Sequence, residues 1–212
     1  MMRGCWLIVL MLAWLVPSAP SRAEPPVAAP SAMVARITLD GPIGPAAAEY
    51  FDDAAQRAVA DGAVAIVLQL DTPGGLSESM RQIIGRMLAL PVPVLVYVAP
   101  GGARAASAGT YILYAGQVAA MAPATHLGAA TPVSLGGATP MPLPAPKASE
   151  PARAGSGAPP AQDEAGDNAE SNKVLNDAIA YIRSLAQLRD RNAAWAEQAV
   201  RGAATLTASE AA

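Results

Sequence analysis

Residues 63–70, with the sequence AVAIVLQL, are the feature that most restricts how this chain can fold. An unbroken apolar run of this length, rich in β-branched residues, is typical of a strand buried on both faces of a parallel sheet. A second run, VLVYV, occupies residues 94–98. Shorter strands are predicted at residues 34–39 and 118–121, so the sequence indicates a sheet built around these four runs.

Segments with helical character separate these strands. They lie at residues 45–61, 77–90 and 105–115, and the last consists mostly of small side chains. Because strands alternate with helices, the crossovers are expected to be right-handed and the sheet mainly parallel. The sequence therefore predicts an α/β fold built from β-α-β units. One face of the first helix is apolar or small and comprises Ala46, Tyr50, Ala54 and Ala58.

Residues 1–23 have the organisation of a secretory signal peptide. Arg3 supplies a short basic region, residues 5–16 are an unbroken apolar run of 12, and residues 21–23 place small side chains at a cleavage site. The run is shorter than the roughly 20 residues of a membrane-spanning helix, although an uncleaved anchor is the alternative. We therefore expect an exported protein on the periplasmic or extracytoplasmic side of the membrane, with a flexible leader at residues 24–32.

The composition excludes several kinds of chemistry. Cys5 is the only cysteine and lies in the predicted signal peptide, so the mature chain has no thiol for a disulfide, a nucleophile or a metal site. His126 is the only histidine, and we expect no metal and no cofactor. Cleavage would remove Arg3 and Arg22 and so change the formal charge from −3 to −5. A mildly acidic chain with 4% aromatic residues gives no reason to expect a nucleic-acid partner.

Residues 134–171 differ from the rest of the chain. They are rich in Pro, Ala, Gly and Ser and have almost no large apolar side chains, so we expect a disordered insertion. This insertion divides a predicted core at residues 33–133 from C-terminal helices at residues 172–212.

The C-terminal segment begins with an amphipathic helix at residues 173–188, and a second helix is predicted at residues 193–200. Thr207 resembles an N-cap with Glu210 three residues later, a capping-box pattern. Because the chain stops shortly after this predicted helix start, we interpret the segment as a truncated C-terminal arm. The apolar face of the first helix comprises Val174, Ala178, Tyr181, Ile182 and Leu185.

A glycine turn, Asp71-Thr-Pro-Gly-Gly75, directly follows the first buried run. Consecutive glycines let the backbone approach a ligand closely. Outward-pointing N–H groups stabilise an oxyanion, and losing one such donor typically costs about 2.7–4 kcal/mol. Gly74 and Gly75 are therefore candidate oxyanion donors, and an ordinary strand-to-helix turn is the alternative. Leu76 and Ser77 follow the turn and are candidate substrate contacts.

Ser107 lies between alanines near the start of the predicted small-residue helix. Small neighbours permit close packing beneath a substrate carbonyl, and a helix N-terminus favours developing negative charge. Ser107 is therefore a candidate nucleophile, with Ala106 and Ala108 as candidate substrate contacts. The alternative is a serine that only caps the helix or fills a small buried space.

A serine nucleophile needs a base. His126 lies in a predicted loop and is poorly placed for this role. The chain has two lysines, of which Lys147 lies in the insertion, whereas Lys173 opens a helix whose apolar face must dock. Lysine has an ordinary pKa of about 10.4, so it acts as a base only where desolvation favours its neutral form. Lys173 is therefore the candidate base, and a solvated helix-terminal residue is the alternative.

Several motifs, in this order, resemble those of the NfeD family of membrane-bound serine proteases, which are Clp-protease-like enzymes with the Clp/crotonase fold. The resemblance covers about residues 33–212. The motifs are Asp71–Gly75, Ala105–Thr110, Met121–Pro123, Gly128–Pro132 and Asn176–Arg183.

The resemblance implies a Ser–Lys dyad formed by Ser107 and Lys173, with oxyanion donors at Gly74 and Gly75. The histidine of the wider Clp-type proteases falls at Ala130, so the resemblance implies that no histidine base is present. It also implies a homodimer or larger assembly, a stomatin-like membrane partner and hydrophobic peptide substrates. If the insertion is mobile, the dyad would form only when substrate or a second subunit orders it.

The sequence therefore favours an exported serine endopeptidase that cleaves hydrophobic segments. Two alternatives remain open. A crotonase-like acyl-CoA enzyme would use the same fold to stabilise an oxyanion, but coenzyme A is cytosolic. A non-catalytic scaffold or assembly factor of a membrane complex would be favoured if Lys173 were exposed and far from Ser107.

Overall fold

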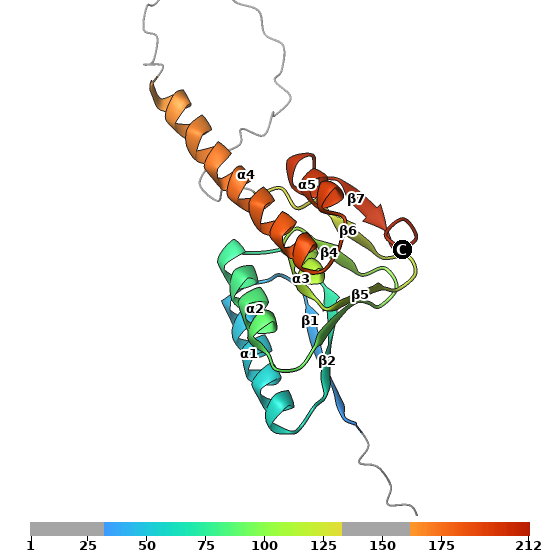
Figure 1. Cartoon of the computed structure of the whole chain (residues 1–212). Coiled ribbons are helices and arrows are strands. Elements are labelled where there is room, and N and C mark those ends of the chain that lie inside the picture. Colours follow the sequence, from blue (N-terminus) through green and yellow to red (C-terminus); the bar gives the residue numbers. More distant parts are fainter. Residues whose placement is uncertain (1–31, 133–161) are drawn as a thin grey trace, which may run out of the picture. The chain divides into compact units, whose positions relative to one another are not determined.

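The structure is a computed structural model that describes residues 32–132 and 162–212. The predictions for the signal peptide, most of the leader and most of the insertion lie outside these residues. The elements, labelled in Figure 1, are β1 (Val34–Asp40), α1 (Pro45–Ala60), β2 (Ala65–Asp71), α2 (Ser77–Ala89), β3 (Val94–Val98), β4 (Arg104–Ala106), α3 (Ala108–Ala115), β5 (Val118–Met121), β6 (His126–Gly128), α4 (Gln162–Leu188), α5 (Ala193–Arg201) and β7 (Thr205–Thr207).

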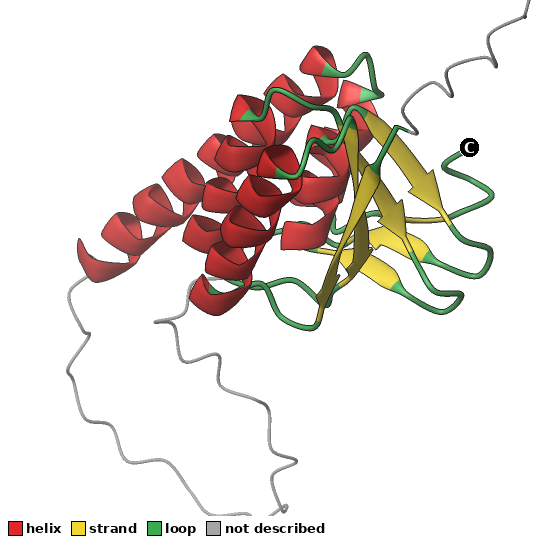
Figure 2. Cartoon of the chain, turned by 90° about the horizontal axis from the view of Figure 1, so that it is seen from below, coloured by secondary structure: helices red, strands yellow, loops and turns green. Residues whose placement is uncertain are grey.

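The main sheet has four strands in the order β1-β2-β3-β5, and every pair in it is parallel. The four strands are those that the apolar runs predict. Because the strands follow one another in a single direction across the sheet, right-handed crossovers place their helices on the same face. Figure 2 shows the helices gathered on one side of the strands. The predicted α/β fold with a mainly parallel sheet is therefore confirmed.

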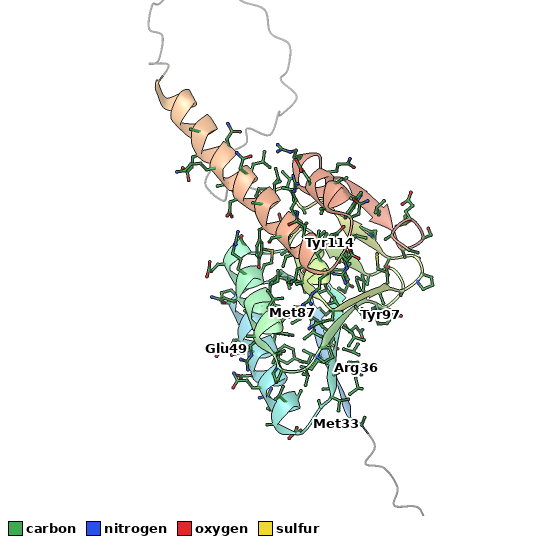
Figure 3. The ribbon with its side chains drawn as sticks, in the orientation of Figure 1. Met33, Arg36, Glu49, Met87, Tyr97 and Tyr114 are labelled. Carbon is green, nitrogen blue, oxygen red and sulfur yellow. The ribbon has the colours of Figure 1, made fainter. Side chains whose placement is uncertain are left out.

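The helices cover only one face of the sheet. In β2, Ile66, Leu68 and Leu70 are fully buried, whereas the residues between them are only half-buried. Figure 3 places Arg36 and Tyr97 on the side of the sheet away from α1 and α2. The prediction that the long apolar run is buried on both faces is therefore wrong for the outer face.

Three short strands form a second sheet in the order β4-β6-β7. Its first strand, β4, includes residues 105 and 106, which the sequence predicted to begin a helix at residues 105–115. The Ala106 N–H donates to the Thr72 carbonyl at 3.1 Å, and the Thr72 N–H donates to the Arg104 carbonyl at 2.7 Å. These two bonds hold β4 as an extension of the β2 end, so helix α3 starts only after Ser107. His126 lies in strand β6 and not in the predicted loop.

The C-terminal segment contains the two predicted helices. Helix α4 begins at Gln162, whereas the sequence places its start after the insertion, and its N-terminal part extends beyond the other helices in Figure 1. Residues 169–174 are exposed, including Val174 of the predicted apolar face. The buried residues of α4 lie further along the helix and are Ile179, Ile182, Leu185 and Ala186.

The predicted capping pair near the end of the chain forms a hydrogen bond. The Thr207 N–H donates to Glu210 Oε2 at 2.8 Å, and this bond lowers the pKa of the Glu210 carboxyl. Within the ranges that the structure describes, no helix combines the length and apolar composition needed to cross a membrane.

Candidate active site

Ser107 lies at the junction between β4 and α3, where its backbone adopts φ 52° and ψ −115°. This conformation is sparsely populated for a residue with a side chain and typically costs about 1–3 kcal/mol. The Ser107 N–H donates to the Gly128 carbonyl at 2.9 Å, and the Ser107 carbonyl accepts from the Thr110 N–H at 3.0 Å. The strained turn therefore fixes a half-buried serine at the N-terminus of a helix.

Gly74 lies directly beneath this serine. Its φ is +116°, and a Cβ added to it would lie 2.6 Å from Ser107 Cβ and 3.1 Å from Ser107 Oγ. Gly75 is restricted for a different reason, because its added Cβ would lie 2.0 Å from the Ile43 carbonyl oxygen. The structure thus brings the predicted glycine turn and the predicted nucleophile together, with no space for a side chain between them.

Thr72 holds the glycine turn in this position. Its fully buried hydroxyl accepts from the Gly74 N–H at 3.1 Å and lies 3.2 Å from the Gly74 carbonyl oxygen. The Gly74 N–H is therefore already paired. The Gly75 N–H, in contrast, has no acceptor among the described residues.

The backbone pairing of Ile43 with the residues on either side of Gly75 explains why the Gly75 N–H is left without an acceptor. Ile43 donates to the Gly74 carbonyl at 2.8 Å, and its own carbonyl accepts from the Leu76 N–H at 2.8 Å. In an extended segment the N–H and C=O of neighbouring residues point to opposite sides. The Gly75 N–H and C=O therefore point away from Ile43, toward the side on which an added peptide strand could pair.

A second buried threonine fixes the serine side of the site. Thr110 Oγ1 accepts from the Gly128 N–H at 3.0 Å and lies 2.8 Å from the Ala105 carbonyl oxygen, to which it can donate. Gly109 completes the packing, since an added Cβ would lie 2.5 Å from Thr72 Cγ2. Sequence reasoning concentrated on the serine and the glycines and missed Thr72 and Thr110, although both lie inside the same two motifs.

The remaining predicted substrate contacts surround the same point. Leu76 is exposed and so is Ser77, whereas Ala106 is half-buried and Ala108 is buried. Ala108 is the first residue of α3, and the N–H of a first helical residue has no partner within its helix. Among the described residues, the Ala108 and Gly75 amides are thus backbone donors near Ser107 with no acceptor, and the buried Gly109 amide is a third.

Lys173 lies apart from this group. Its side chain is 78% exposed, and its Nζ lies 3.5 Å from Glu170 Oε2 on the same exposed part of α4. No hydrogen bond joins Lys173 to Ser107 in the parts of the chain that the structure describes. In this arrangement the ammonium is hydrated, so the structure does not supply the desolvated lysine that the predicted dyad needs.

Helix α4 packs against the core from Leu175 onward, two residues after Lys173. Asp177 forms an ion pair with Arg81 of α2 at 2.5 Å, and Tyr181 stacks on Tyr111 of α3 with ring centroids 6.0 Å apart. Burial raises the pKa of Tyr111 to about 12, an effect that nearby Arg81 partly opposes.

Neither His126 nor Ala130, the position that matches the histidine of Clp-type proteases, is suited to act as a base. His126 is exposed on β6. Ala130 is buried, and its N–H donates to the Ala199 carbonyl of α5 at 2.8 Å. In residues 32–132 and 162–212, no group of three His, Cys, Asp or Glu side chains is arranged to hold a metal ion.

A parallel α/β sheet, a serine strained at a strand-to-helix junction and a glycine turn against its side chain define the chain as a Clp-protease-like domain. The family model described as the NfeD1b N-terminal domain matches residues 33–141. The membrane-bound protease PH1510 of Pyrococcus horikoshii is 39% identical over 165 residues, which are 77% of this chain and 31% of that protein. The chain thus belongs to the NfeD family and spans about a third of the length of this curated relative.

Two solved structures of similar proteins cover most of the described fold. One is a serine-to-alanine mutant of the 1510-N membrane-bound stomatin-specific protease, with a TM-score of 0.66 and 36% identity over 85% of this chain and 75% of that chain. The other is a lysine-to-alanine mutant of the same protease in complex with a substrate peptide, with a TM-score of 0.66 and 37% identity over 85% of this chain and 71% of that chain.

Proposed function

We propose that this chain is a serine endopeptidase domain in which Ser107 is the nucleophile and Lys173 is the base. The observation that carries the proposal is the contact between Gly74 and Ser107, because it sets a strained serine against a glycine turn at the start of a helix. The printed descriptions of the similar structures, a serine mutant and a lysine mutant of a protease, support the same pair of residue types.

In the proposed reaction Ser107 Oγ attacks the carbonyl carbon of the scissile peptide bond, and its proton passes to the neutral amine of Lys173. The negative charge on the carbonyl oxygen is stabilised by the glycine turn, with the Gly75 N–H donating and Gly74 leaving the space that the serine needs. The Ala108 N–H is the second donor. Lys173 then protonates the leaving amine, and water hydrolyses the ester on Ser107.

The proposed dyad requires the first turns of α4 to move toward Ser107. Residues 169–174 are exposed and make no buried contact that opposes such a movement. Binding of substrate or of a second subunit over these turns would exclude water from Lys173 and favour its neutral form. We therefore propose that the dyad is completed in the assembled, substrate-bound enzyme, which is a homodimer or larger.

The proposed substrates are extended apolar segments of a stomatin-like membrane protein, reached from the extracytoplasmic side after export. A peptide strand could pair with the outward N–H and C=O of Gly75 and place an apolar side chain against exposed Leu76. The similar structures include a stomatin-specific protease with a bound substrate peptide, which supports this substrate class.

A second candidate function is a non-catalytic scaffold of a membrane complex. The exposure of Lys173 and its ion pair with Glu170 favour it, because a hydrated lysine is a poor base. In this case the fold would be retained for assembly only.

Cleavage assays on the full chain separate the two functions. Apolar and charged peptides of equal length are incubated with wild type, Ser107→Ala, Lys173→Ala and Lys147→Ala, the last being the matched lysine control. We expect wild type and Lys147→Ala to cleave apolar peptides faster than charged ones. Ser107→Ala and Lys173→Ala should cleave neither measurably. Unchanged cleavage by Ser107→Ala would refute the nucleophile, and absence of cleavage by wild type with the stomatin-like partner present would favour the scaffold.

A further inference from the structure

Four side chains join three helices beside the candidate site. They are Arg81 of α2, Tyr111 of α3, and Asp177 and Tyr181 of α4, and we refer to them as the three-helix clamp. Arg81 Nη2 lies 2.5 Å from Asp177 Oδ2, and the Arg81 guanidinium carbon lies 4.1 Å from the Tyr181 ring centroid. The Tyr181 ring in turn stacks on Tyr111, with 22° between the ring planes. One arginine therefore contacts α4 through both an ion pair and an aromatic face.

The clamp lies one helical turn away from the proposed catalytic residues. Tyr111 lies in the first turn of α3, which begins directly after Ser107, and Asp177 follows Lys173 by four residues on α4. Residues four apart lie on the same face of a helix, about 5–6 Å from each other. The clamp thus holds the helical turn next to Ser107 and the helical turn next to Lys173 against each other.

The two sides of the clamp differ in what surrounds them. On α3, Tyr111 is buried, and its hydroxyl lies 3.4 Å from the Ala130 carbonyl oxygen. On α4, every residue from 169 to 174 is exposed, and the first buried residue is Ile179. Between Lys173 and Ile179, α4 is held by the Asp177–Arg81 ion pair and by Leu175, which is half-buried against the core.

We propose that Arg81 is a positioning residue that directs α4 so that Lys173 can reach Ser107. This inference rests on the proposed Ser–Lys mechanism and names the group that makes its second residue available. Exposed ion pairs contribute little to stability. The effect of Arg81 is therefore expected on the direction of α4 more than on the folding of the domain.

The Asp177–Arg81 ion pair can matter for the reaction because of where it holds α4. A turn of α-helix rises about 5.4 Å, so a hinge at Asp177 leaves Lys173 only a short arm. With Arg81 in place the amine samples a small volume. Without Arg81 this part of α4 is held only by half-buried apolar side chains such as Leu175. The amine then samples a larger volume, which reduces the fraction of productive encounters with Ser107.

Kinetics with matched variants test this role. Arg81→Met and Asp177→Asn remove the ion pair, Arg81→Lys keeps its charge, and Arg183→Met is the control because it breaks a different α4 ion pair, with Glu197. We expect kcat to fall about tenfold or more in Arg81→Met with little change in KM, and Arg81→Lys to recover part of the loss. Equal effects of Arg81→Met and Arg183→Met would contradict a positioning role.

A measurement without catalysis separates this inference from the proposed mechanism. In the full chain carrying Cys5→Ser, Ser107→Cys and Lys173→Cys, a short thiol crosslinker reports how often the two positions meet in the presence of the apolar peptide. We expect efficient crosslinking that falls several-fold when Arg81→Met or Asp177→Asn is added, in samples whose thermal unfolding confirms that they remain folded. Crosslinking that is unaffected by both substitutions would overturn the role of Arg81 and leave the dyad intact. No crosslinking in the background chain would refute both.

Discussion

Gly74 and Ser107 are in van der Waals contact across the candidate active site, and a Cβ on Gly74 would lie 2.6 Å from Ser107 Cβ. The two residues come from different motifs, one after β2 and the other before α3. Their contact makes the glycine turn part of the surroundings of the serine side chain.

Gly74→Ala should reduce peptide cleavage by about 100-fold, because the new methyl group displaces Ser107 by a fraction of an ångström or more. Gly41→Ala is the matched control: its φ is +101°, close to the +116° of Gly74, but its added Cβ meets nothing within 4 Å. Each substitution should cost about 1–2 kcal/mol of stability from backbone strain. Equal loss of activity in both variants would show that strain alone is responsible.

Thr72→Val should destabilise the fold by about 1–3 kcal/mol and also lower activity, since it leaves the Gly74 N–H buried without its acceptor. Thr131→Val is the control, because it removes a hydroxyl that donates to the Val200 carbonyl at 2.7 Å, away from the glycine turn. Urea unfolding and cleavage rates, measured together for both variants, separate a general loss of stability from a specific loss of activity. If Thr72→Val keeps full activity, the threonine does not position the turn.

The sequence predicted the strands of the main sheet and the helices between them, because long apolar runs and Gly or Pro boundaries are local signals. It did not predict β4, since three residues of small side chains carry no strand pattern of their own. Residues Arg104–Ala106 become a strand because the end of β2 offers Thr72 as a backbone partner. The strained turn at Ser107 is a consequence of this tertiary pairing.

The motifs predicted that Ser107, Gly74 and Gly75 belong to one candidate site. The structure brings Gly74 close to Ser107, whereas the catalytic roles of these residues stay predictions. The position of Lys173 depends on how α4 leaves the other helices, and this depends on contacts such as Arg81 with Asp177, which no local pattern reveals. The role of Lys173 therefore stays a prediction.

Arg191→Met should destabilise the domain by about 3 kcal/mol, because the guanidinium donates to three carbonyl groups at the end of α3. Its Nη1 lies 3.0 Å from the Leu113 oxygen and 2.6 Å from the Tyr114 oxygen, and its Nη2 lies 2.9 Å from the Gly116 oxygen. Figure 3 labels Tyr114 in this region, between α3 and the C-terminal helices. Arg191→Lys should recover little of the loss, because lysine lacks the planar fork. Chemical unfolding that gives equal stability for Lys and Arg would contradict this account.

Alkaline pH should destabilise the domain through tyrosines whose pKa is raised by burial, which are Tyr111, Tyr114 and Tyr181. Burial raises the pKa of Tyr111 and of Tyr114 from the ordinary 10.0 to about 12. Because the unfolded state then loses these protons at lower pH than the folded state, stability is complete below about pH 10 and decreases as the pH rises toward about 12. Urea unfolding across this range measures the decrease, and Tyr114→Phe should make it shallower. An unchanged slope in Tyr114→Phe would contradict burial as the cause.

The most direct test of the central claim is to identify the residue that a serine-directed phosphonate modifies. Wild-type full chain, Ser107→Ala and Lys173→Ala are treated with the probe in the presence of the stomatin-like partner, digested and analysed by peptide mass spectrometry. The account predicts a single adduct on Ser107 in wild type, none in Ser107→Ala, and much slower labelling in Lys173→Ala because the serine lacks its base. An adduct on a different residue, or equally fast labelling of Lys173→Ala, would contradict the Ser–Lys assignment.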